Sequence, residues 1–120
     1  MITKDSTEDT VTPLKPRPAT STEARNLITS MAHGAAVLGD DASTDQCARI
    51  LGVCLWRDID TITFGNLVDD MVMADRVRLG NDIPELTVGT AAERGEWITY
   101  YETQARCHIN ELLYAAGYGL

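Results

Sequence analysis

The strongest constraint on the fold of this 120-residue chain is a short motif that occurs twice. Each copy is followed by a long amphipathic segment. Thr20-x-x-Glu23 and Thr90-x-x-Glu93 both match a capping box, in which the two side chains bind free backbone amides at a helix start. After each motif, apolar residues recur at i, i+3, i+4 and i+7, which is the period of one helix face. The pattern predicts helices that begin at these two threonines, the second of which runs to Gly117.

The segment between these motifs predicts two further helices. Residues 43–56 begin with a capping pattern at Ser43 and are apolar almost all round, which favours a buried central helix. A strand through residues 49–56 is the alternative. Thr63 is the predicted start of a third helix that ends before Gly80. With short connections, four such segments predict an all-α, small four-helix bundle-like domain.

The first residues of the chain have no helical period. Residues 1–19 contain the run PLKPRP, and each proline removes an amide donor and disfavours helix in the residue before it. We predict an extended or disordered N-terminal arm over residues 1–19, which either stays free or lies on a partner. A single helical domain over residues 20–120 follows, and its length suits one hydrophobic core.

Charge and hydropathy narrow the expected partners. The net charge is −8, and the acidic excess lies in residues 21–120, which hold seven arginines and no lysine. Because phosphate contacts dominate affinity for nucleic acids, we expect no direct nucleic-acid binding. A helix-turn-helix alignment on Gly52 also fails, since Asp58 and Thr61 stand where that motif buries apolar residues.

No apolar run is long enough to span a bilayer, and the N-terminus lacks the apolar region of a signal peptide. We therefore expect no membrane partner and a cytoplasmic location, or a place in a virion assembled there.

The cysteine count of three is odd, which argues against a disulfide framework. Cys47 and Cys54 also lie about 10 Å apart on one predicted helix, beyond disulfide reach. Free thiols are the expectation.

One cluster of reactive residues lies near the C-terminus. Cys107, His108 and Glu111 are close in sequence, but bundle metal sites use the reverse order, Glu-x-x-His, and the other histidine is only His33. Neighbours on a helix point about 100° apart, so Cys107 and His108 do not form a catalytic pair. We predict no catalytic residue, no metal and no cofactor, hence a non-enzymatic protein. Whether His108 does more than pack stays open.

The last predicted helix has two apolar lines. One serves the core, and the other contains Tyr100, Cys107 and Tyr114, spaced seven residues apart. A surface helix normally has one apolar face, so a second face indicates a central helix or contact with another chain. Outward-facing apolar residues on the other helices extend the predicted interface, which comprises Trp56, Met73, Val77, Tyr100, Cys107 and Tyr114.

These patterns favour a protein-interaction component: a small adaptor, assembly or accessory subunit of a homo- or hetero-oligomer, such as a viral connector. The alternative is an acidic regulator or nucleic-acid mimic that binds a basic partner, and a metal-dependent helical enzyme is the third class. The acidic surface of the alternative would comprise Asp40, Asp41, Asp45, Asp58, Asp60, Asp69 and Asp70. The partner, the stoichiometry and the biological process stay open.

Overall fold

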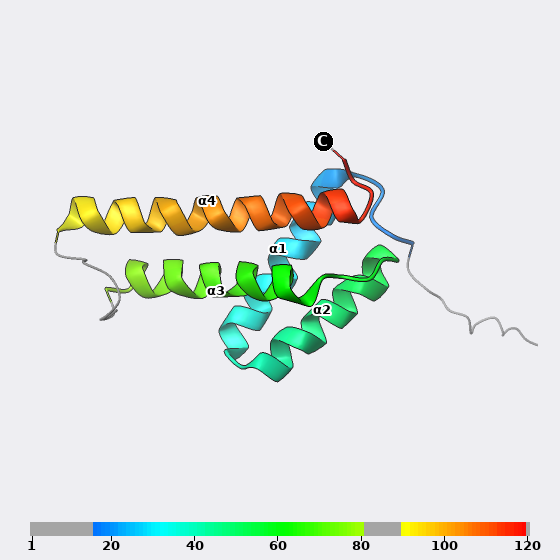
Figure 1. The fold of residues 1–120 in the computed structure, drawn as a ribbon, viewed down its shortest axis with the longest axis horizontal. Helices are drawn as coiled ribbons and strands as arrows, with labels where there is room; N and C mark the ends of the chain where they lie inside the picture. The colour runs from blue at the N-terminus through cyan, green and yellow to red at the C-terminus, as the bar shows by residue number, and fades with distance from the viewer. Residues whose placement is uncertain (1–15, 81–89, 120) are drawn as a thin grey trace, which may run out of the picture.

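The fold is known from a computed structural model that describes residues 16–80 and 90–119. Four helices form, in the order α1 (Ser21–Leu38), α2 (Asp41–Leu55), α3 (Thr61–Arg78) and α4 (Ala91–Ala115) (Figure 1). The described ranges contain no strand, so the predicted all-α, four-helix fold is confirmed. The strand alternative for residues 49–56 is wrong, because α2 occupies that segment.

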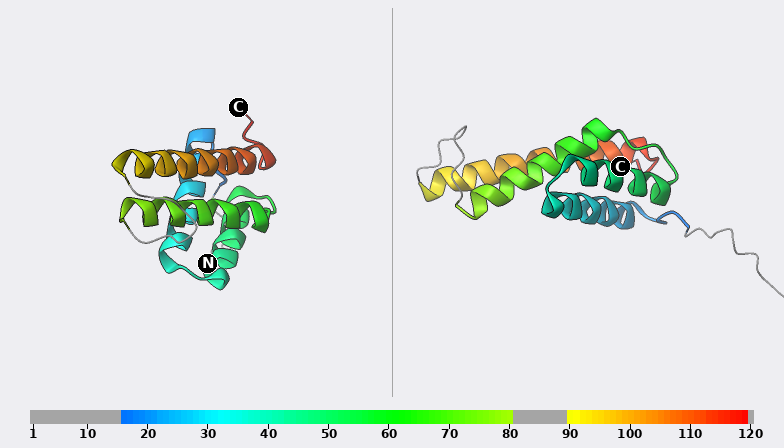
Figure 2. Two further views of the ribbon diagram at one scale, coloured as in Figure 1. Left: turned by 60° about the vertical axis from the view of Figure 1, so that its left-hand side comes forward. Right: turned by 90° about the horizontal axis from the view of Figure 1, so that it is seen from below.

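The helices pair as two hairpins. α3 and α4 run antiparallel and side by side, and α1 and α2 form a second hairpin that lies across one side of them (Figures 1 and 2). α1 and α3 each contact all three other helices, whereas α2 and α4 each contact only these two. The end of the α3–α4 hairpin that carries Arg78 and Ala91 extends beyond α1 and α2 (Figure 1).

Two helix starts follow the predicted motif. The Thr20 hydroxyl accepts a hydrogen bond from the Glu23 amide at 3.1 Å, and the Glu23 carboxylate accepts one from the Thr20 amide at 3.3 Å. Thr90 and Glu93 form the same pair of bonds at the start of α4. The predicted capping boxes are therefore confirmed, because each satisfies amides that have no partner within the helix.

The other two helix starts differ from the prediction. Asp40, not Ser43, caps α2: its carboxylate accepts the Ser43 amide at 2.7 Å and the Ser43 hydroxyl at 2.9 Å. Asp60 caps α3 in the same way and accepts the Thr63 hydroxyl at 3.1 Å. Both hydroxyls thus donate to an upstream carboxylate rather than cap a helix themselves. Each of these helices begins earlier than the sequence pattern predicted.

Acid is expected to weaken both of these helix starts. Hydrogen bonds from the backbone amides of Ser43 and Ile62, and then from the neighbouring hydroxyls, hold the pKa of Asp40 and Asp60 below the usual value for an aspartate. This stabilisation is complete above the unfolded-state pKa and is lost as the pH falls through the lower folded-state pKa. Urea unfolding followed by circular dichroism at about pH 5 and about pH 2.5 should therefore show a lower midpoint in acid.

A double variant provides the control. Asn is also a good helix cap and does not titrate, so Asp40→Asn/Asp60→Asn should lose less of its midpoint between the two pH values than the parent chain. An equal loss in both proteins would show that the caps contribute nothing to acid sensitivity.

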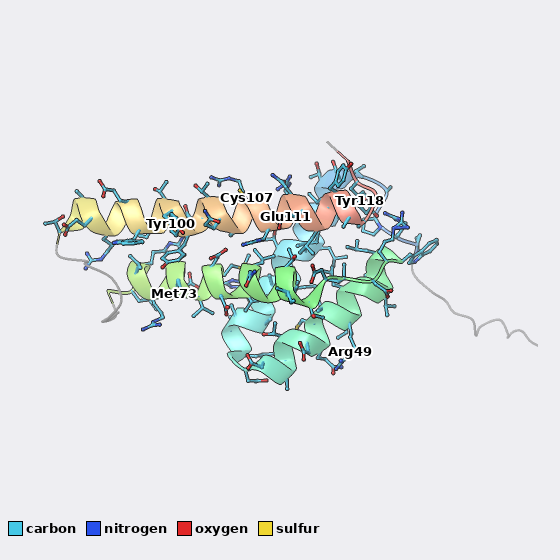
Figure 3. The ribbon with its side chains drawn as sticks, viewed as in Figure 1. Arg49, Met73, Tyr100, Cys107, Glu111 and Tyr118 are labelled. Atoms are coloured by element: carbon cyan, nitrogen blue, oxygen red, sulfur yellow. The ribbon has the colours of Figure 1, made fainter. Side chains whose placement is uncertain are left out.

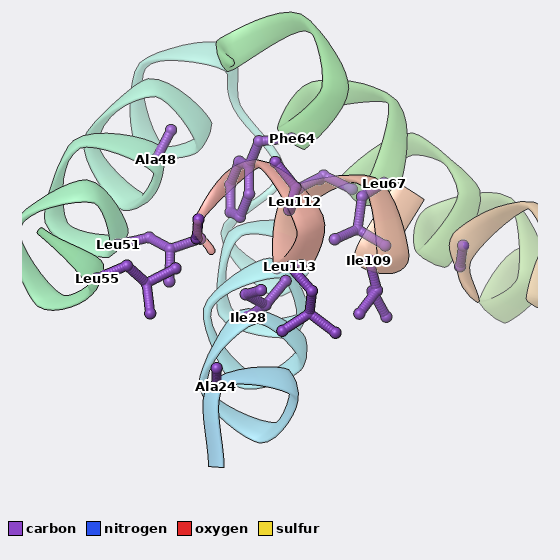
Figure 4. Packing of buried hydrophobic residues seen from close by; sticks show 14 of the residues in the cluster. Ala24, Ile28, Ala48, Leu51, Leu55, Phe64, Leu67, Ile109, Leu112 and Leu113 are labelled. Carbon is purple, nitrogen blue, oxygen red and sulfur yellow. The ribbon is translucent and has the colours of Figure 1, made fainter. Parts of the chain in front are cut away.

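The core lies where the two hairpins cross. α1 contributes a stripe of mostly small residues, which lets the other helices approach closely. Larger side chains from the other helices fill the space, with Phe64 near the centre (Figure 4). The fully buried members include Ala24, Ile28, Ala32, Ala35, Leu51, Leu55, Phe64, Leu67 and Leu113. One cluster therefore joins all four helices, as expected of a single domain.

The segment before α1 is bound to the C-terminus. The Arg17 guanidinium stacks 4.4 Å from the centre of the Tyr118 ring and donates to the Tyr118 hydroxyl and the Ala116 carbonyl. The Tyr118 hydroxyl in turn donates to the Pro18 carbonyl at 2.7 Å. The last residues of the predicted arm over 1–19 thus pack on the domain. The rest of that prediction, residues 1–15, lies outside the described residues.

Candidate protein-interaction surfaces

The C-terminal end of α2 has an unusual backbone. Trp56 follows the helix with φ 59° and ψ 36°, in the left-handed region, and is the one non-glycine residue with positive φ in the described ranges. The Arg57 amide donates to the Gly52 carbonyl at 3.1 Å, which closes a Schellman-type turn. Glycine is usual at such a position, and another residue costs about 1–2 kcal/mol there.

Gly52 allows this turn to close. A Cβ on Gly52 would lie 2.8 Å from the Arg57 carbonyl oxygen, which is closer than a Cβ can approach a backbone atom. Burial of Leu55 just before the turn and partial burial of Ile59 just after it hold the chain in place. The surrounding packing therefore maintains the strained backbone of Trp56.

Apolar side chains gather on the surface at this turn. Val53 is 65% exposed and Trp56 is 56% exposed, and Ile50 is also exposed one turn earlier. We call these three residues the Trp56 patch. Beside it lies an open hollow of about 780 Å³, whose lining includes Arg49 and Arg57. Exposed tryptophan next to arginine is typical of residues that dominate binding energy at protein interfaces.

The position of α2 corrects one prediction. The sequence predicted a buried central helix, but α2 contacts only α1 and α3 and buries only Ala48, Leu51 and Leu55. Ile50 and Val53 face away from this narrow stripe and are exposed, and no other described helix lies against them. The apolar residues on all sides of α2 therefore indicate an exposed apolar face, not a helix that is buried among the other helices.

The second apolar line of α4 lies on the outside of the molecule. Tyr100 is 50% exposed, Tyr114 is 76% exposed and Cys107 is exposed between them. Figure 3 labels Tyr100 and Cys107 along α4. Ala105 and Ile109 are buried on the opposite side. The predicted division of this helix into an inner and an outer face is therefore confirmed.

Aromatic rings cluster near the start of α4. Trp97 stacks on Tyr101 at a centroid distance of 6.0 Å, and both rings contact the edge or face of Tyr100. Trp97 and Tyr101 are half-buried, while Tyr100 lies at the outer side of the group. The cluster thus fixes the orientation of Tyr100 on the exposed face.

α3 provides fewer outward contacts than the sequence predicted. Val77 is 1% exposed, so its predicted role as an interface residue is wrong. Met73 is half-buried, with the Arg76 guanidinium 3.7 Å from its sulfur. The buried side of α3 rotates along its length, from Phe64 near the crossing point to Val77 in the half that extends along α4. The helix-wheel prediction assumed one fixed core direction.

His108 joins two helices rather than forming a reactive pair with Cys107. Its Nε2 lies 3.4 Å from a carboxylate oxygen of Asp70 on α3, and its Nδ1 lies 3.2 Å from Glu111. Burial raises the pKa of Asp70, the charge of His108 opposes this rise, and Asp69 adds to it. Nothing in this arrangement brings a nucleophile to the imidazole.

Among residues 16–80 and 90–119, no group of three His, Cys, Asp or Glu side chains converges as a metal site would require. The same residues contain no disulfide: Cys47 and Cys54 are half-buried, and Cys107 is exposed. None of the described helices is long and apolar enough to cross a membrane.

Three of the seven aspartates of the alternative hypothesis have structural roles. Asp40 and Asp60 bind helix-start amides, and Asp70 lies against His108. The remaining four are exposed and belong to α2, the α2–α3 connection and α3, namely Asp41, Asp45, Asp58 and Asp69. The fold therefore uses three of the seven for its own structure.

Comparison with known proteins gives no relative from which to transfer a function. No family model matches the chain, and no curated protein and no solved structure matches it. The geometry of the described residues is therefore the basis for assigning a function.

Proposed function

We propose that this protein is a non-enzymatic protein-interaction component, an adaptor, assembly or accessory subunit that works in the cytoplasm or in a virion. The observation that carries the proposal is the Trp56 patch. A strained backbone at an exposed tryptophan costs stability, and such outliers persist mainly where function requires them. Binding of a partner would cover apolar surface that the described residues leave open.

The chemistry around the patch defines the partner class. Val53 and Trp56 provide an apolar contact, and the exposed residues Arg49, Arg57 and Asp58 line the same hollow. Arginine binds carboxylates with two parallel hydrogen bonds. The partner that fits is a protein segment presenting an apolar side chain with a carboxylate next to it.

A capture experiment tests this proposal. The tagged full-length chain, its Trp56→Ala variant and its Leu79→Ala variant are incubated with extract of the native source, and bound proteins are quantified by mass spectrometry. Leu79 is equally apolar and is 76% exposed, but lies at the end of α3 away from the patch. We expect at least one protein that the parent and Leu79→Ala retain and Trp56→Ala loses. Identical sets for all three proteins would contradict the proposal.

The acidic regulator is the second candidate, supported by the net charge of −8. A partner bound through the exposed aspartates would be released as salt is raised from about 50 to 500 mM, because screening removes attraction between exposed charges. A partner bound through the Trp56 patch should depend much less on salt. The same capture, repeated across salt concentrations, separates the two functions.

A further inference from the structure

We propose that the outer face of α4 binds the same face of a second copy of this chain, as an antiparallel pair centred on Cys107. This outer α4 face comprises Tyr100, Thr103, Gln104, Cys107, Glu111 and Tyr114. It is distinct from the Trp56 patch on α2, so the two proposals can fail independently.

The spacing of the exposed residues is symmetric. Tyr100 precedes Cys107 by seven residues and Tyr114 follows it by seven, which is nearly two helical turns in each direction. The three side chains therefore lie along one line of α4, with a drift of about 20° per heptad. A two-fold interface pairs residue i with j and residue j with i. An antiparallel pair centred on Cys107 places each Tyr100 on Tyr114 of the second copy.

The charges on this face permit self-association. Two copies of a chain with net charge −8 repel, so a self-complementary surface must avoid opposing like charges. Between the two tyrosines, the outer α4 face carries one charged side chain, Glu111. In the antiparallel register Glu111 lies opposite Thr103 of the second copy, whose hydroxyl can donate to the carboxylate. No carboxylate of this face then opposes another.

The length of the outer α4 face determines how strongly two copies are expected to bind. Tyr100 to Tyr114 spans about 21 Å of helix, so one α4 pair gives an interface at the small end of the specific range. We expect a weak dimer, present at tens to hundreds of micromolar and dissociated well below that. Added salt should strengthen it, because screening reduces repulsion between the two acidic chains.

The exposed thiol gives a direct readout of the register. Diamide oxidises two thiols to a disulfide and takes up their two protons and two electrons to become a hydrazine. A Cys107 disulfide requires the two Cα atoms to lie about 4.4–6.8 Å apart, as they do where two helices pack face to face at this residue. Cys47 and Cys54 are half-buried and are not on this face.

The first test uses the full-length chain at about 100 µM, within the concentration range in which the weak dimer is expected to form. After brief diamide treatment we expect a covalent dimer on a non-reducing gel for the parent chain and none for Cys107→Ser. Tyr100→Ala/Tyr114→Ala, which keeps the thiol, should reduce the dimer yield at least fivefold. An equal yield in that variant would indicate random collision and overturn the proposal. Circular dichroism confirms that each variant keeps its helices.

A second test determines the direction of pairing. Thr103→Cys and Glu111→Cys are made separately in a Cys107→Ser background, and each is oxidised alone and in a mixture. The antiparallel pair predicts a covalent dimer only in the mixture, joining one variant to the other. Dimers formed by each variant alone would indicate parallel helices and contradict the proposal. The proposal would also be overturned if no variant cross-links and the parent chain sediments as a monomer. Sedimentation velocity at about 100 µM protein and high salt makes that measurement.

Discussion

Replacing Phe64 by alanine is expected to lower the free energy of unfolding by about 3–5 kcal/mol. Phe64 is the largest fully buried side chain in the described ranges and lies in a cluster to which all four helices contribute (Figure 4). The loss combines the transfer of the ring to water with a cavity that backbone packing cannot close. Since domains of this size are stable by about 5–15 kcal/mol, a large share of the total should disappear.

Urea unfolding followed by circular dichroism measures this loss. Ile62→Ala is the matched control, because Ile62 lies in the same first turn of α3 but is largely exposed. That change should alter the free energy of unfolding by no more than about 0.5 kcal/mol. A Phe64 variant no less stable than the Ile62 variant would mean that the core is not assembled as described.

The second large effect concerns Trp56. Trp56→Ala and Trp56→Gly both remove the ring, but only glycine adopts positive φ without a steric penalty. We therefore expect the glycine variant to be more stable than the alanine variant by about 1 kcal/mol, although glycine lowers stability at most positions. Chemical denaturation of the two variants measures the difference.

Binding should not follow this order of stability. If Trp56 contacts a partner, both variants lose the same ring, and a loss of about 2 kcal/mol or more is typical of a buried interface tryptophan. Leu38→Gly and Leu38→Ala provide the backbone control, since Leu38 is an exposed residue at the end of α1 with ordinary helical geometry. There the glycine variant should be the less stable of the two.

The sequence predicted the elements of the fold better than their boundaries. Thr20 and Thr90 were found because a capping box involves two side chains at a fixed spacing, which the sequence displays directly. Asp40 and Asp60 were missed because Ser43 and Thr63 are also good caps, and sequence alone does not tell which oxygen accepts the amide. The Asp-x-x-Ser and Asp-x-x-Thr spacing was the available signal.

Burial was harder to predict than helicity. Whether Val53 and Val77 are covered depends on which helix lies against each face, and that is decided by how the two hairpins cross. The helical-wheel prediction for α4 succeeded because the buried residues of this helix, Ala105, Ile109, Leu112 and Leu113, all lie on the predicted inner side. The strain at Trp56 was not predictable, since the left-handed turn is imposed by packing on either side of it rather than by the residue itself.

The most direct test of the interaction proposal is the affinity of a captured partner for three forms of the chain, measured by calorimetry. We expect both Trp56→Ala and Trp56→Gly to bind at least about thirtyfold more weakly than the parent chain, and equally weakly, despite their different stabilities. Affinities within about threefold of the parent, or a loss that follows stability rather than the missing ring, would contradict the assignment of this surface as a protein-binding site.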